Sequence, residues 1–492
     1  MTEGQSSYRQ IFKATSLFGG VQIFQIIVGI VRTKLVAVIL GAAGVGIMGL
    51  LNAPLQVIIS VTGLGISYSA VRDIGEAYGR GDQGRISYAI TILRRWSWFT
   101  GFLGAIVTIT IAPLLSQWTF GNRDYAWSFV WLSVTLLLQS LSKGQSTILQ
   151  GTRRLKEMAK SGVIGSALGL FTSIPLYYWL GIRGIVPAMV ISALTALILS
   201  WYYSRKVIVQ DVSLTIKESY KSGLGMARLG IYMTVAGFIA SFSTYILNAF
   251  ISNKGGIEQV GFYNAGWGVV GQYTGIIFSA MATDYFPRLS AVQTDDEKVK
   301  ELVQQQAITA LLIMGPLLAL LITAMPVVVR ILYTPAFSPV VMFASLTLLG
   351  IQFKAISWSM GYVYLAKGDG SLFLKLEVIS GLAILGFNLF LYNLLGLNGL
   401  GISFIISYFL AIIISYLVLK LNYNFSLSRK FYLIFFLTYG FVILAFLTVF
   451  IESIFIRYAI GAVIFILAAL TSLSQLNQLL DLKSLIRDRF RN

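Results

Sequence analysis

The sequence of 492 residues contains no cysteine and no histidine. Without cysteine, the chain has no disulfide and offers no thiolate nucleophile or thiolate metal ligand. Without histidine, it lacks the side chain that most often serves proteins as a general base and metal ligand. Most classes of enzyme fit this composition poorly. We therefore predict a protein with no catalytic residue, no metal and no cofactor.

Charged residues are also scarce, at 11% of the chain compared with roughly 25% in soluble domains. Hydrophobic residues make up 57%, and the mean hydropathy is +0.79. Long apolar runs recur over the whole length and leave no soluble domain of useful size. The first run lacks an Ala-x-Ala cleavage site soon after it, so it is predicted to be a retained helix. These features predict an all-α polytopic membrane protein.

A helix needs about 20 apolar residues to span a bilayer, and hydropathy with loop punctuation predicts about 14 such spans. The first six are 11–40, 47–69, 96–118, 125–149, 162–180 and 184–203. The next six are 229–251, 262–284, 307–332, 340–366, 372–394 and 397–419, and two more, 431–450 and 454–473, complete the set.

Acidic residues are few, with 19 Asp and Glu against 37 Lys and Arg and a net charge of +18. Membrane proteins concentrate Lys and Arg in their cytoplasmic loops. If the N-terminus is cytoplasmic, most of the cations fall in inner loops and few fall in outer loops. This asymmetry predicts a multi-pass protein with both termini in the cytoplasm, and it explains the basic charge without a nucleic-acid partner.

Two hairpins along the chain resemble each other. LGIRGIVPAMVISALTALILSWYYSRKV, from residue 180, resembles LGLNGLGISFIISYFLAIIISYLVLKLN, from residue 395, at an offset of 215 residues. The matched positions are Gly181, Gly184, Ser192, Ala196 and Ser200 with Gly396, Gly399, Ser407, Ala411 and Ser415, and earlier Val45 and Gly46 with Val260 and Gly261. The alternative is shared small-residue helix packing without common descent.

The duplication predicts two six-helix lobes related by a pseudo-two-fold axis along the membrane normal. The predicted organisation is an N-lobe over residues 1–203, a cytoplasmic linker over 204–228, a C-lobe over 229–424, and helices 13 and 14 with a basic cytoplasmic tail over 425–492. Such lobes enclose a central cavity, and rocking of one lobe against the other gives alternating access.

Four cations remain after those of the termini and of the predicted inner and outer loops have been assigned: Arg32, Lys34, Lys143 and Lys354. A charged residue at the centre of a span costs about 2.5–3.5 kcal/mol on insertion scales, so such residues usually face a cavity. With no intramembrane acid expected nearby, the four cations predict an anionic ligand such as a phosphate or diphosphate. The alternative is that these long side chains reach the membrane interface and bind nothing.

Polar and aromatic side chains in the spans are candidate sugar contacts. The amides recur at helical spacing, and the aromatic rings are suited to stack on sugar rings. These candidates are Gln22, Gln25, Asn52, Gln56, Trp267 and Trp358. Polar residues that hold helices together and aromatic belts at the interface remain alternatives for the same positions.

Two acids lie near the ends of spans, Asp73 after the second and Asp284 at the end of the eighth. We interpret their charges as cytoplasmic locks between the lobe ends, with ion coupling as an alternative role. The segment SAVQTDDEKVKELVQQQA, residues 290–307, is predicted to form an amphipathic interfacial helix, and a solvated linker is the alternative.

Three segments resemble a known family. RTKLVAVILGAAGVGIMGLL (32–51) is similar to the first-helix and loop pattern of polysaccharide flippases in the multidrug, oligosaccharidyl-lipid and polysaccharide (MOP) exporter superfamily. VVRILYTPAFSPVVMFASLTLLG (328–350) is a second resemblance, with a weaker counterpart in LLSQWTFGNRDYAWSFVWLSV (114–134). The fourteen-helix count with a six-plus-six repeat fits the same superfamily over nearly the whole chain.

The resemblance implies a two-lobe bundle in the bacterial inner membrane that flips undecaprenyl-diphosphate-linked oligosaccharide, as in O-antigen, capsule or exopolysaccharide assembly. It implies that cavity cations, Arg32 foremost, engage the diphosphate. Partners would be the lipid-linked oligosaccharide, the bilayer and a polysaccharide polymerase with its chain-length machinery.

Other functions stay open from the sequence. A lipid II flippase also fits fourteen helices and a cationic cavity. A small-solute or drug antiporter is less consistent, because the first and seventh predicted helices contain no Asp or Glu. A membrane-embedded glycosyltransferase is weaker still, because every outer loop is short. No G-x-x-x-x-G-K-[ST] motif is present, which argues against an ATP-driven pump.

Overall fold

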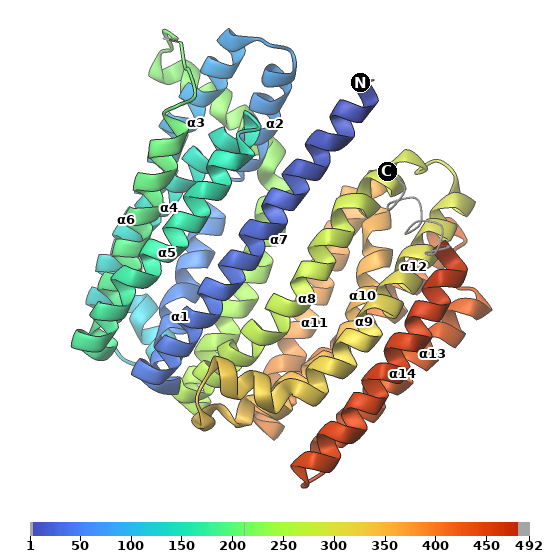
Figure 1. Ribbon diagram of the computed structural model, residues 1–492. Helices are drawn as coiled ribbons and strands as arrows, with labels where there is room; N and C mark the ends of the chain where they lie inside the picture. Colours follow the sequence, from blue (N-terminus) through green and yellow to red (C-terminus); the bar gives the residue numbers. More distant parts are fainter. Residues whose placement is uncertain (1–2, 211, 481–492) are drawn as a thin grey trace. The chain divides into compact units, whose positions relative to one another are not determined.

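The computed structural model describes residues 3–210 and 212–480, and this part of the chain is helical without a strand (Figure 1). By contacts it divides into two compact units, Met1–Gly261 and Phe262–Asn492. The first unit contains α1 (Glu3–Thr62), α2 (Ile66–Gly79), α3 (Gln83–Phe120), α4 (Ala126–Gly151), α5 (Leu155–Leu180), α6 (Ile185–Ser204) and α7 (Ile216–Gly255). After α8 (Ile257–Ala291), the second contains α9 (Asp296–Leu332), α10 (Pro339–Ala366), α11 (Gly370–Leu395), α12 (Leu397–Tyr423), α13 (Arg429–Leu447) and α14 (Ile454–Leu480).

The all-helical, membrane-spanning class predicted from the sequence is confirmed. Nine stretches of the described residues are long and apolar enough to cross a membrane. One of them, Leu155–Ser204, contains both α5 and α6. From residue 96 onward, each predicted span overlies its own α-helix. The total of fourteen spans stays a prediction.

The long helix α1 is interrupted at Gly41, where φ is 66° and ψ is −168°. Glycine adopts this conformation readily because it has no Cβ. The break falls between the first two predicted spans, as expected. The second span was predicted to run to residue 69, but the helix ends at Thr62 and α2 begins at Ile66. The turn between them contains Leu64 with φ 50° and Gly65 with φ 63°, which ends the helix earlier than hydropathy alone indicates.

The segment that joins α6 to α7 is fastened to the beginning of α3. Gln83 Nε2 donates a hydrogen bond to the backbone oxygen of Ile208 at 2.6 Å. Arg95 Nη1 donates to Ser219 Oγ at 2.6 Å, and Trp96 Nε1 donates to the Ser219 backbone oxygen at 2.9 Å. These bonds pair backbone groups that a free linker would leave to water. Ile208 and Ser219, on either side of residue 211, are therefore attached to α3 within the first unit.

Helix α7 also belongs to the first unit by its packing, because it contacts α1, α2 and α3. The sequence repeat placed the lobe boundary at residue 229, whereas the compact unit continues to Gly261. Contacts show which helices pack together, whereas a sequence repeat shows which segments share an ancestor. A helix that belongs to one repeat can therefore pack on helices of the other. The four predicted domain ranges stay a prediction about the repeat.

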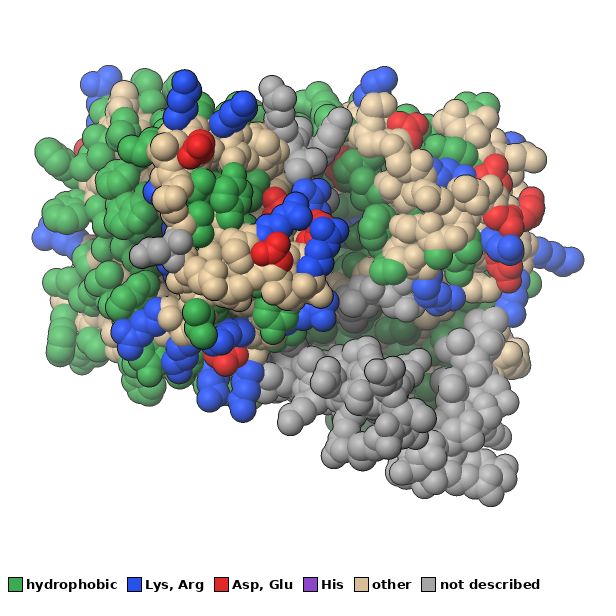
Figure 2. Space-filling view, turned by 90° about the horizontal axis from the view of Figure 1, so that it is seen from above, with side chains coloured by type: hydrophobic (Ala, Val, Ile, Leu, Met, Phe, Trp, Pro, Cys, Tyr) green, Lys and Arg blue, Asp and Glu red, His purple; other side chains and the backbone are tan. Residues whose placement is uncertain are grey.

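The end of the molecule that carries the 205–215 segment is rich in Lys and Arg side chains, shown in blue in Figure 2. Arg72, Arg80 and Arg95 are exposed there, and the first two form ion pairs with Asp73 and Glu76 at 2.8 Å. The distribution agrees with the positive-inside pattern. The assignment of this end to the cytoplasm stays a prediction.

The predicted interfacial helix over residues 290–307 does not form as a separate element. Helix α9 begins at Asp296, is capped by the side chain of Asp295, and continues without interruption to Leu332. Val299 and Val303 are one turn apart, and both are buried in the cluster that contains Tyr285. This buried face explains why the polar-looking segment extends a spanning helix instead of lying on the membrane.

The connection between α13 and α14 is held by Arg457, near the beginning of α14. Its guanidinium donates to the backbone oxygens of Thr448, Val449 and Ile451 at 3.2, 2.6 and 2.9 Å. The last carbonyls of a helix have no partner within it, and a cation at that end satisfies them and interacts favourably with the helix dipole. Arg457 therefore caps the short 3-10 turn, Thr448–Phe450, that follows α13.

The offset of 215 residues is visible in local geometry. Helices α5 and α11 begin and end at matched positions. They are preceded by matched turns with a positive φ, 55° at Arg153 and 76° at Gly368. They end at Gly181 with φ 55° and ψ −132°, and at Gly396 with φ 58° and ψ −140°. Such agreement outside regular helix supports common descent of the two hairpins.

Four matched residues within the first unit also make a reciprocal contact. A Cβ on Gly46 would clash with the backbone oxygen of Ile257, and a Cβ on Gly261 would clash with that of Ala42. Ala42 and Ile257 differ by the same 215 positions as Gly46 and Gly261. Exchanging each residue for its matched partner turns the first of these contacts into the second. This equivalence is what a local two-fold axis produces.

A test of the repeat geometry uses Gly184 and Gly399, where an added Cβ would clash with the backbone oxygens of Leu176 and Leu391. We expect Gly184→Ala and Gly399→Ala each to destabilise the fold by about 1–3 kcal/mol, because backbone atoms cannot move aside. The midpoint of thermal unfolding in detergent measures the effect.

The matched control is Gly386→Ala in α11, where a Cβ meets no atom within 4 Å. It should be neutral or stabilising by up to about 1 kcal/mol, because alanine favours helix over glycine. Equal midpoints for Gly399→Ala and Gly386→Ala would contradict the close approach.

Candidate functional site

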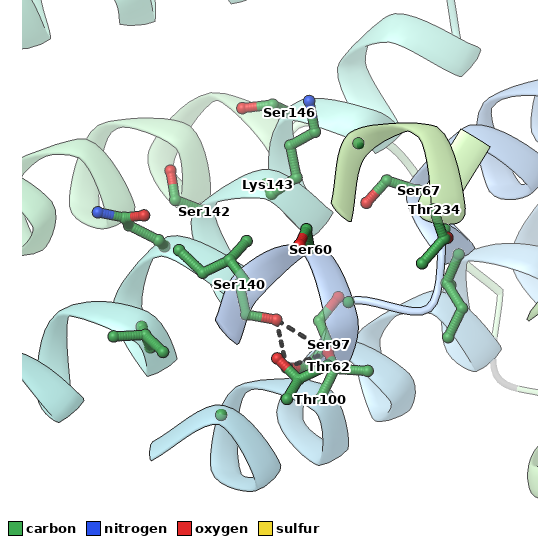
Figure 3. A pocket seen from close by; sticks show the side chains of 18 of the residues that line it. Ser60, Thr62, Ser67, Ser97, Thr100, Ser140, Ser142, Lys143, Ser146 and Thr234 are labelled. Atoms are coloured by element: carbon green, nitrogen blue, oxygen red, sulfur yellow. Dashed lines mark hydrogen bonds between the residues drawn. The ribbon is translucent and has the colours of Figure 1, made fainter. Parts of the chain in front are cut away.

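The first unit contains a polar cavity of about 570 Å³ bounded by α1, α2, α3, α4, α6 and α7. Its polar lining consists of hydroxyl and amide groups with one lysine (Figure 3). These residues are Gln56, Ser60, Thr62, Ser67, Tyr68, Ser97, Thr100, Gln139, Ser140, Ser142, Lys143, Ser146 and Thr234. None of the described residues in this lining is acidic. The cavity therefore offers many hydrogen-bond donors and acceptors and one positive charge.

The break between α1 and α2 forms part of the cavity wall through Gly63 and Gly65. Non-helical backbone at membrane depth is tolerated only where it is buried in protein or lines a water-filled cavity. The residue between them, Leu64, has a positive φ, which is uncommon for a side chain of its kind. The cavity thus gives the backbone groups of this turn access to water, and the turn forms part of the cavity wall.

Helices α3 and α4 supply the hydroxyl-rich wall. Ser140 Oγ lies 2.9 Å from Thr100 Oγ1 and donates to the backbone oxygen of Ser97 at 2.9 Å, as the dashed lines in Figure 3 show. Gly101 and Gly104 lie in the same part of α3, where a Cβ would press on α4. Small residues let the two helices approach closely enough for these bonds.

The sequence argument missed most of this wall. Ser97, Thr100 and Gly104 are spaced i, i+3 and i+7, so they share one face of α3. On α4, Gln139, Lys143 and Ser146 share a face in the same way. The missed signal is a set of small and hydroxyl residues at helical spacing. A hydropathy window averages them with the apolar residues around them, so the polar face of the helix does not stand out.

Lys143 is the predicted cation that the structure places in this cavity. Its side chain is exposed, and no hydrogen bond or ion pair of its ammonium is recorded in the described part of the chain. Figure 3 places it beside Ser146, on the opposite side of the cavity from the Thr100 and Ser140 hydroxyls. A lysine without a carboxylate, surrounded by hydroxyls, is suited to an anion that carries polar groups.

Of the predicted sugar contacts, Gln56 lies in the cavity lining. Its Nε2 donates to Asn52 Oδ1 at 3.3 Å, one turn earlier in α1. Asn52 is outside the lining and supports Gln56 from the same helix face. Arg32 and Lys34 are half-buried in α1 before the break at Gly41, also outside the lining. Their part in a common site stays a prediction.

Lys354 belongs to the second unit, where aromatic rings surround its ammonium. Lys354 Nζ lies 5.3 Å from the Phe278 ring centroid and 5.7 Å from that of Tyr408. Both distances are typical of cation–π attraction, which helps to hold a desolvated cation. The predicted Trp358 packs nearby, 5.6 Å from Phe278 and 4.7 Å from Tyr362 between ring centroids.

The other predicted residues have separate surroundings. Trp267 makes an edge contact with Phe404 at 5.6 Å between centroids. Asp73 pairs with its neighbour Arg72, which satisfies its charge within α2. The side chains of Gln22, Gln25 and Asp284 lie outside the described residues. Ion coupling or a lobe lock at Asp73 and Asp284 stays a prediction.

That the predicted cations have no intramembrane acid nearby stays a prediction. One carboxylate of the second unit, Glu377, lies in α11 within the predicted span 372–394. Tyr408, whose ring centroid is 5.7 Å from Lys354 Nζ, lies in the next helix, α12. The second unit therefore combines a lysine, a tyrosine and a carboxylate, whereas the cavity of the first unit has a lysine without an acid.

Long apolar helices around a polar cavity define a multi-pass membrane protein. The fold is that of solved transporters of the MOP superfamily. It matches the lipid II flippase MurJ in an inward closed conformation, with TM-score 0.71, 13% identity, and 95% of this chain and 99% of that one covered. It also matches an inward-facing multidrug MATE transporter, with TM-score 0.64, 16% identity and 82% and 94% coverage.

Sequence comparison identifies the family. The model of the polysaccharide biosynthesis protein family matches residues 35–342, more than half of the chain, and the chain belongs to this family. It is 24% identical over 318 residues to a Shigella flexneri protein assigned as an O-antigen transporter, covering 63% of this chain and 74% of that one. The family resemblance predicted from the sequence is confirmed.

Because the chain has no cysteine, an introduced thiol can report water access to the cavity. We expect Ser146→Cys, in the cavity lining, to react with a charged methanethiosulfonate reagent in vesicles open on both sides. The thiolate that reacts forms only where water reaches the sulfur. Mass spectrometry of the intact protein measures the modified fraction.

The control is Ser133→Cys in the same helix, where the serine is 2% exposed. It should react only after denaturation. A Ser146→Cys variant that is as unreactive as Ser133→Cys in folded protein would show that the cavity is not open to water.

Proposed function

We propose that this protein is a flippase that moves an undecaprenyl-diphosphate-linked oligosaccharide from the cytoplasmic to the periplasmic leaflet of the bacterial inner membrane. The cargo would be a repeat unit of O-antigen, capsule or exopolysaccharide. The observation that carries the proposal is the cavity of the first unit, which combines a hydroxyl and amide lining with Lys143 and contains no acidic residue in its described lining. Membership of the polysaccharide biosynthesis protein family supports it.

The lining matches the chemistry of such a head group. Sugar hydroxyls both donate and accept hydrogen bonds, as do the Ser, Thr and Gln side chains of the wall. A lysine engages phosphate oxygens by charge-assisted hydrogen bonds. The volume of about 570 Å³ is that of a typical ligand pocket, so it accommodates the diphosphate and adjoining sugars and leaves the lipid tail in the bilayer.

Transport requires the site to open to each side in turn. We propose that two six-helix lobes, related by a pseudo-two-fold axis and followed by two further helices, rock to expose it. The matched turns at Gly181 and Gly396 and the reciprocal contact of Gly46 and Gly261 support this arrangement. Arg32, Lys34 and Lys354 would offer further positive charge to the diphosphate along its path. No bond of the cargo is made or broken, so the protein is a transporter.

Lipid II flipping is the second candidate. The MurJ structure covers almost the whole chain, and lipid II is itself a diphosphate-linked saccharide. Transport of cationic drugs fits less well, because a cation needs a carboxylate and the described cavity lining has none. A glycosyltransferase fits least, since the described residues of the cavity lining include no acid to assist glycosyl transfer.

The proposal predicts that Lys143→Ala lowers flipping by about tenfold or more, because a charge-assisted hydrogen bond to phosphate is lost. Lys143→Arg should retain most activity, since it keeps the charge. The rate at which lipid-linked oligosaccharide becomes accessible to an impermeant probe in oriented vesicles measures flipping. Lys354→Ala should also reduce the rate while expression holds.

The matched control is Lys160→Ala, an exposed lysine in α5 that is absent from the cavity lining. It should flip at the wild-type rate. Wild-type flipping in the double variant of Lys143 and Lys354 would remove both lysines from the mechanism.

Removal of the gene from its host tests the function itself. Build-up of full-length precursor on the cytoplasmic leaflet with loss of surface glycan, both restored by the gene, is the expected result. Depletion of cell-wall precursor at the outer face would instead favour lipid II. Surface glycan that persists without accumulated precursor in a strain lacking other flippases would overturn the polysaccharide proposal.

A further inference from the structure

A second cavity of the first unit, of about 810 Å³, lies between α3, α4, α6 and the beginning of the segment that joins α6 to α7. Arg94 and Arg205 both line it, together with Trp98, Trp201 and Gln145. The remaining lining is apolar except for Ser97, and none of its described residues is acidic. This cavity therefore pairs two arginines with two tryptophans, unlike the hydroxyl-lined cavity that contains Lys143.

The two arginines have no carboxylate partner in the described part of the chain. The Arg205 guanidinium carbon lies 5.1 Å from the Trp201 ring centroid and 4.9 Å from that of Tyr202. Stacking on aromatic rings orients a guanidinium and leaves its N–H donors available at the edge. Arg94 is half-buried in α3, and among the described residues its side chain has no hydrogen-bond or ion-pair partner. A partly buried charge without a counter-charge favours the binding of an anion.

A third polar group of the lining is fixed from outside the cavity. Ser204 Oγ donates to Gln145 Oε1 at 2.6 Å, and Ser204 is fully buried. This bond occupies the amide oxygen, so the two N–H donors of Gln145 remain for a ligand. Two guanidiniums and one amide group give a set of donors only, which suits the acceptor oxygens of a phosphate.

The tryptophans indicate where this site lies relative to the bilayer. Trp98 is 49% exposed and Trp201 is 50% exposed, so both rings are on the outer surface of the unit. Tryptophan concentrates at the boundary between the head groups and the hydrocarbon core. The cavity also lies at the end of α6 that carries Arg205 and Lys206, the end seen in Figure 2 and predicted to be cytoplasmic.

We propose that this cavity binds the phosphate of an anionic phospholipid from the cytoplasmic leaflet, with Arg94 and Arg205 on the phosphate and the two tryptophans along the glycerol and upper acyl chains. Basic pockets between helices on this side of a membrane are suited to such head groups. The volume falls within the roughly 300–1,000 Å³ of ordinary ligand pockets. The cavity shares Ser97 with the proposed cargo cavity, and its other lining residues are different.

The position of the site gives the lipid a structural role. Val207, Ile208 and Val209 also line the cavity, and they belong to the segment that leads into α7. A bound lipid would therefore contact α3, α6 and this segment together. Gln83 already fixes Ile208 to α3, and the lipid would add a second attachment from the membrane side.

Native mass spectrometry of the full chain, titrated with phosphatidylglycerol or with zwitterionic phosphatidylethanolamine in detergent, tests the proposal. We expect wild-type protein to retain phosphatidylglycerol preferentially. In Arg94→Gln/Arg205→Gln its affinity should fall about tenfold or more, the effect of losing one or more charge-assisted hydrogen bonds. Arg205→Gln alone, at an exposed position, should show part of the loss and serves if the double variant does not fold.

The matched control is Arg183→Gln, an exposed arginine just before the opposite end of α6, which should bind lipid as wild type does. Equal phosphatidylglycerol affinity in wild type, Arg205→Gln and the double variant would overturn the proposal. Displacement of the lipid by millimolar inorganic phosphate would also overturn it, because the site would then recognise free phosphate. Loss of lipid affinity in Lys143→Ala to the same extent would assign the binding to the cargo cavity instead.

Discussion

The requirement that backbone polar groups find partners without water governs this structure. A chain with a mean hydropathy of +0.79 has long segments in hydrocarbon, where only a helix satisfies its own N–H and C=O groups. Each interruption therefore needs a local solution. Gly41 turns with a positive φ, the Gly63–Gly65 turn faces a cavity, and Arg457 supplies donors to the carbonyls after α13. The cavity is a consequence of one such interruption.

The same requirement makes close helix packing valuable, and glycine provides it. At Gly184 and Gly399 the backbone lies against a carbonyl near the end of the previous helix, that of Leu176 in α5 and that of Leu391 in α11, so no side chain fits there. Replacing either glycine by a larger residue would disrupt the turn in that copy of the hairpin. That explains why the sequence identity between the halves survives at these glycines while the residues around them have diverged.

Much of the fold was predictable because hydropathy and small-residue spacing are local signals. They located the helices from residue 96 onward, the break near Gly41 and the offset of 215. Features that depend on contacts between distant segments were not accessible. The attachment of Ile208 to Gln83, the burial of Val303 within an extended α9 and the packing of α7 on the first unit all belong to this class. For the site, the positive charge of Lys143 identified it within an apolar span. The sequence argument did not identify the hydroxyl residues of α3, because such residues are neutral and common in membrane helices.

The offset also shows how the two halves have come to differ at matched positions. Lys354, Phe278 and Tyr408 correspond to Gln139, Gly63 and Ala193, which line the cavity of the first unit. The second half thus has two aromatic side chains and a lysine where the first half has a glycine, an alanine and a glutamine. Lys143 in turn corresponds to Trp358. One half has open polar volume at these positions, and the other has aromatic rings and a lysine. Sugars accept both kinds of surface, since their hydroxyls form hydrogen bonds and their C–H faces pack against rings.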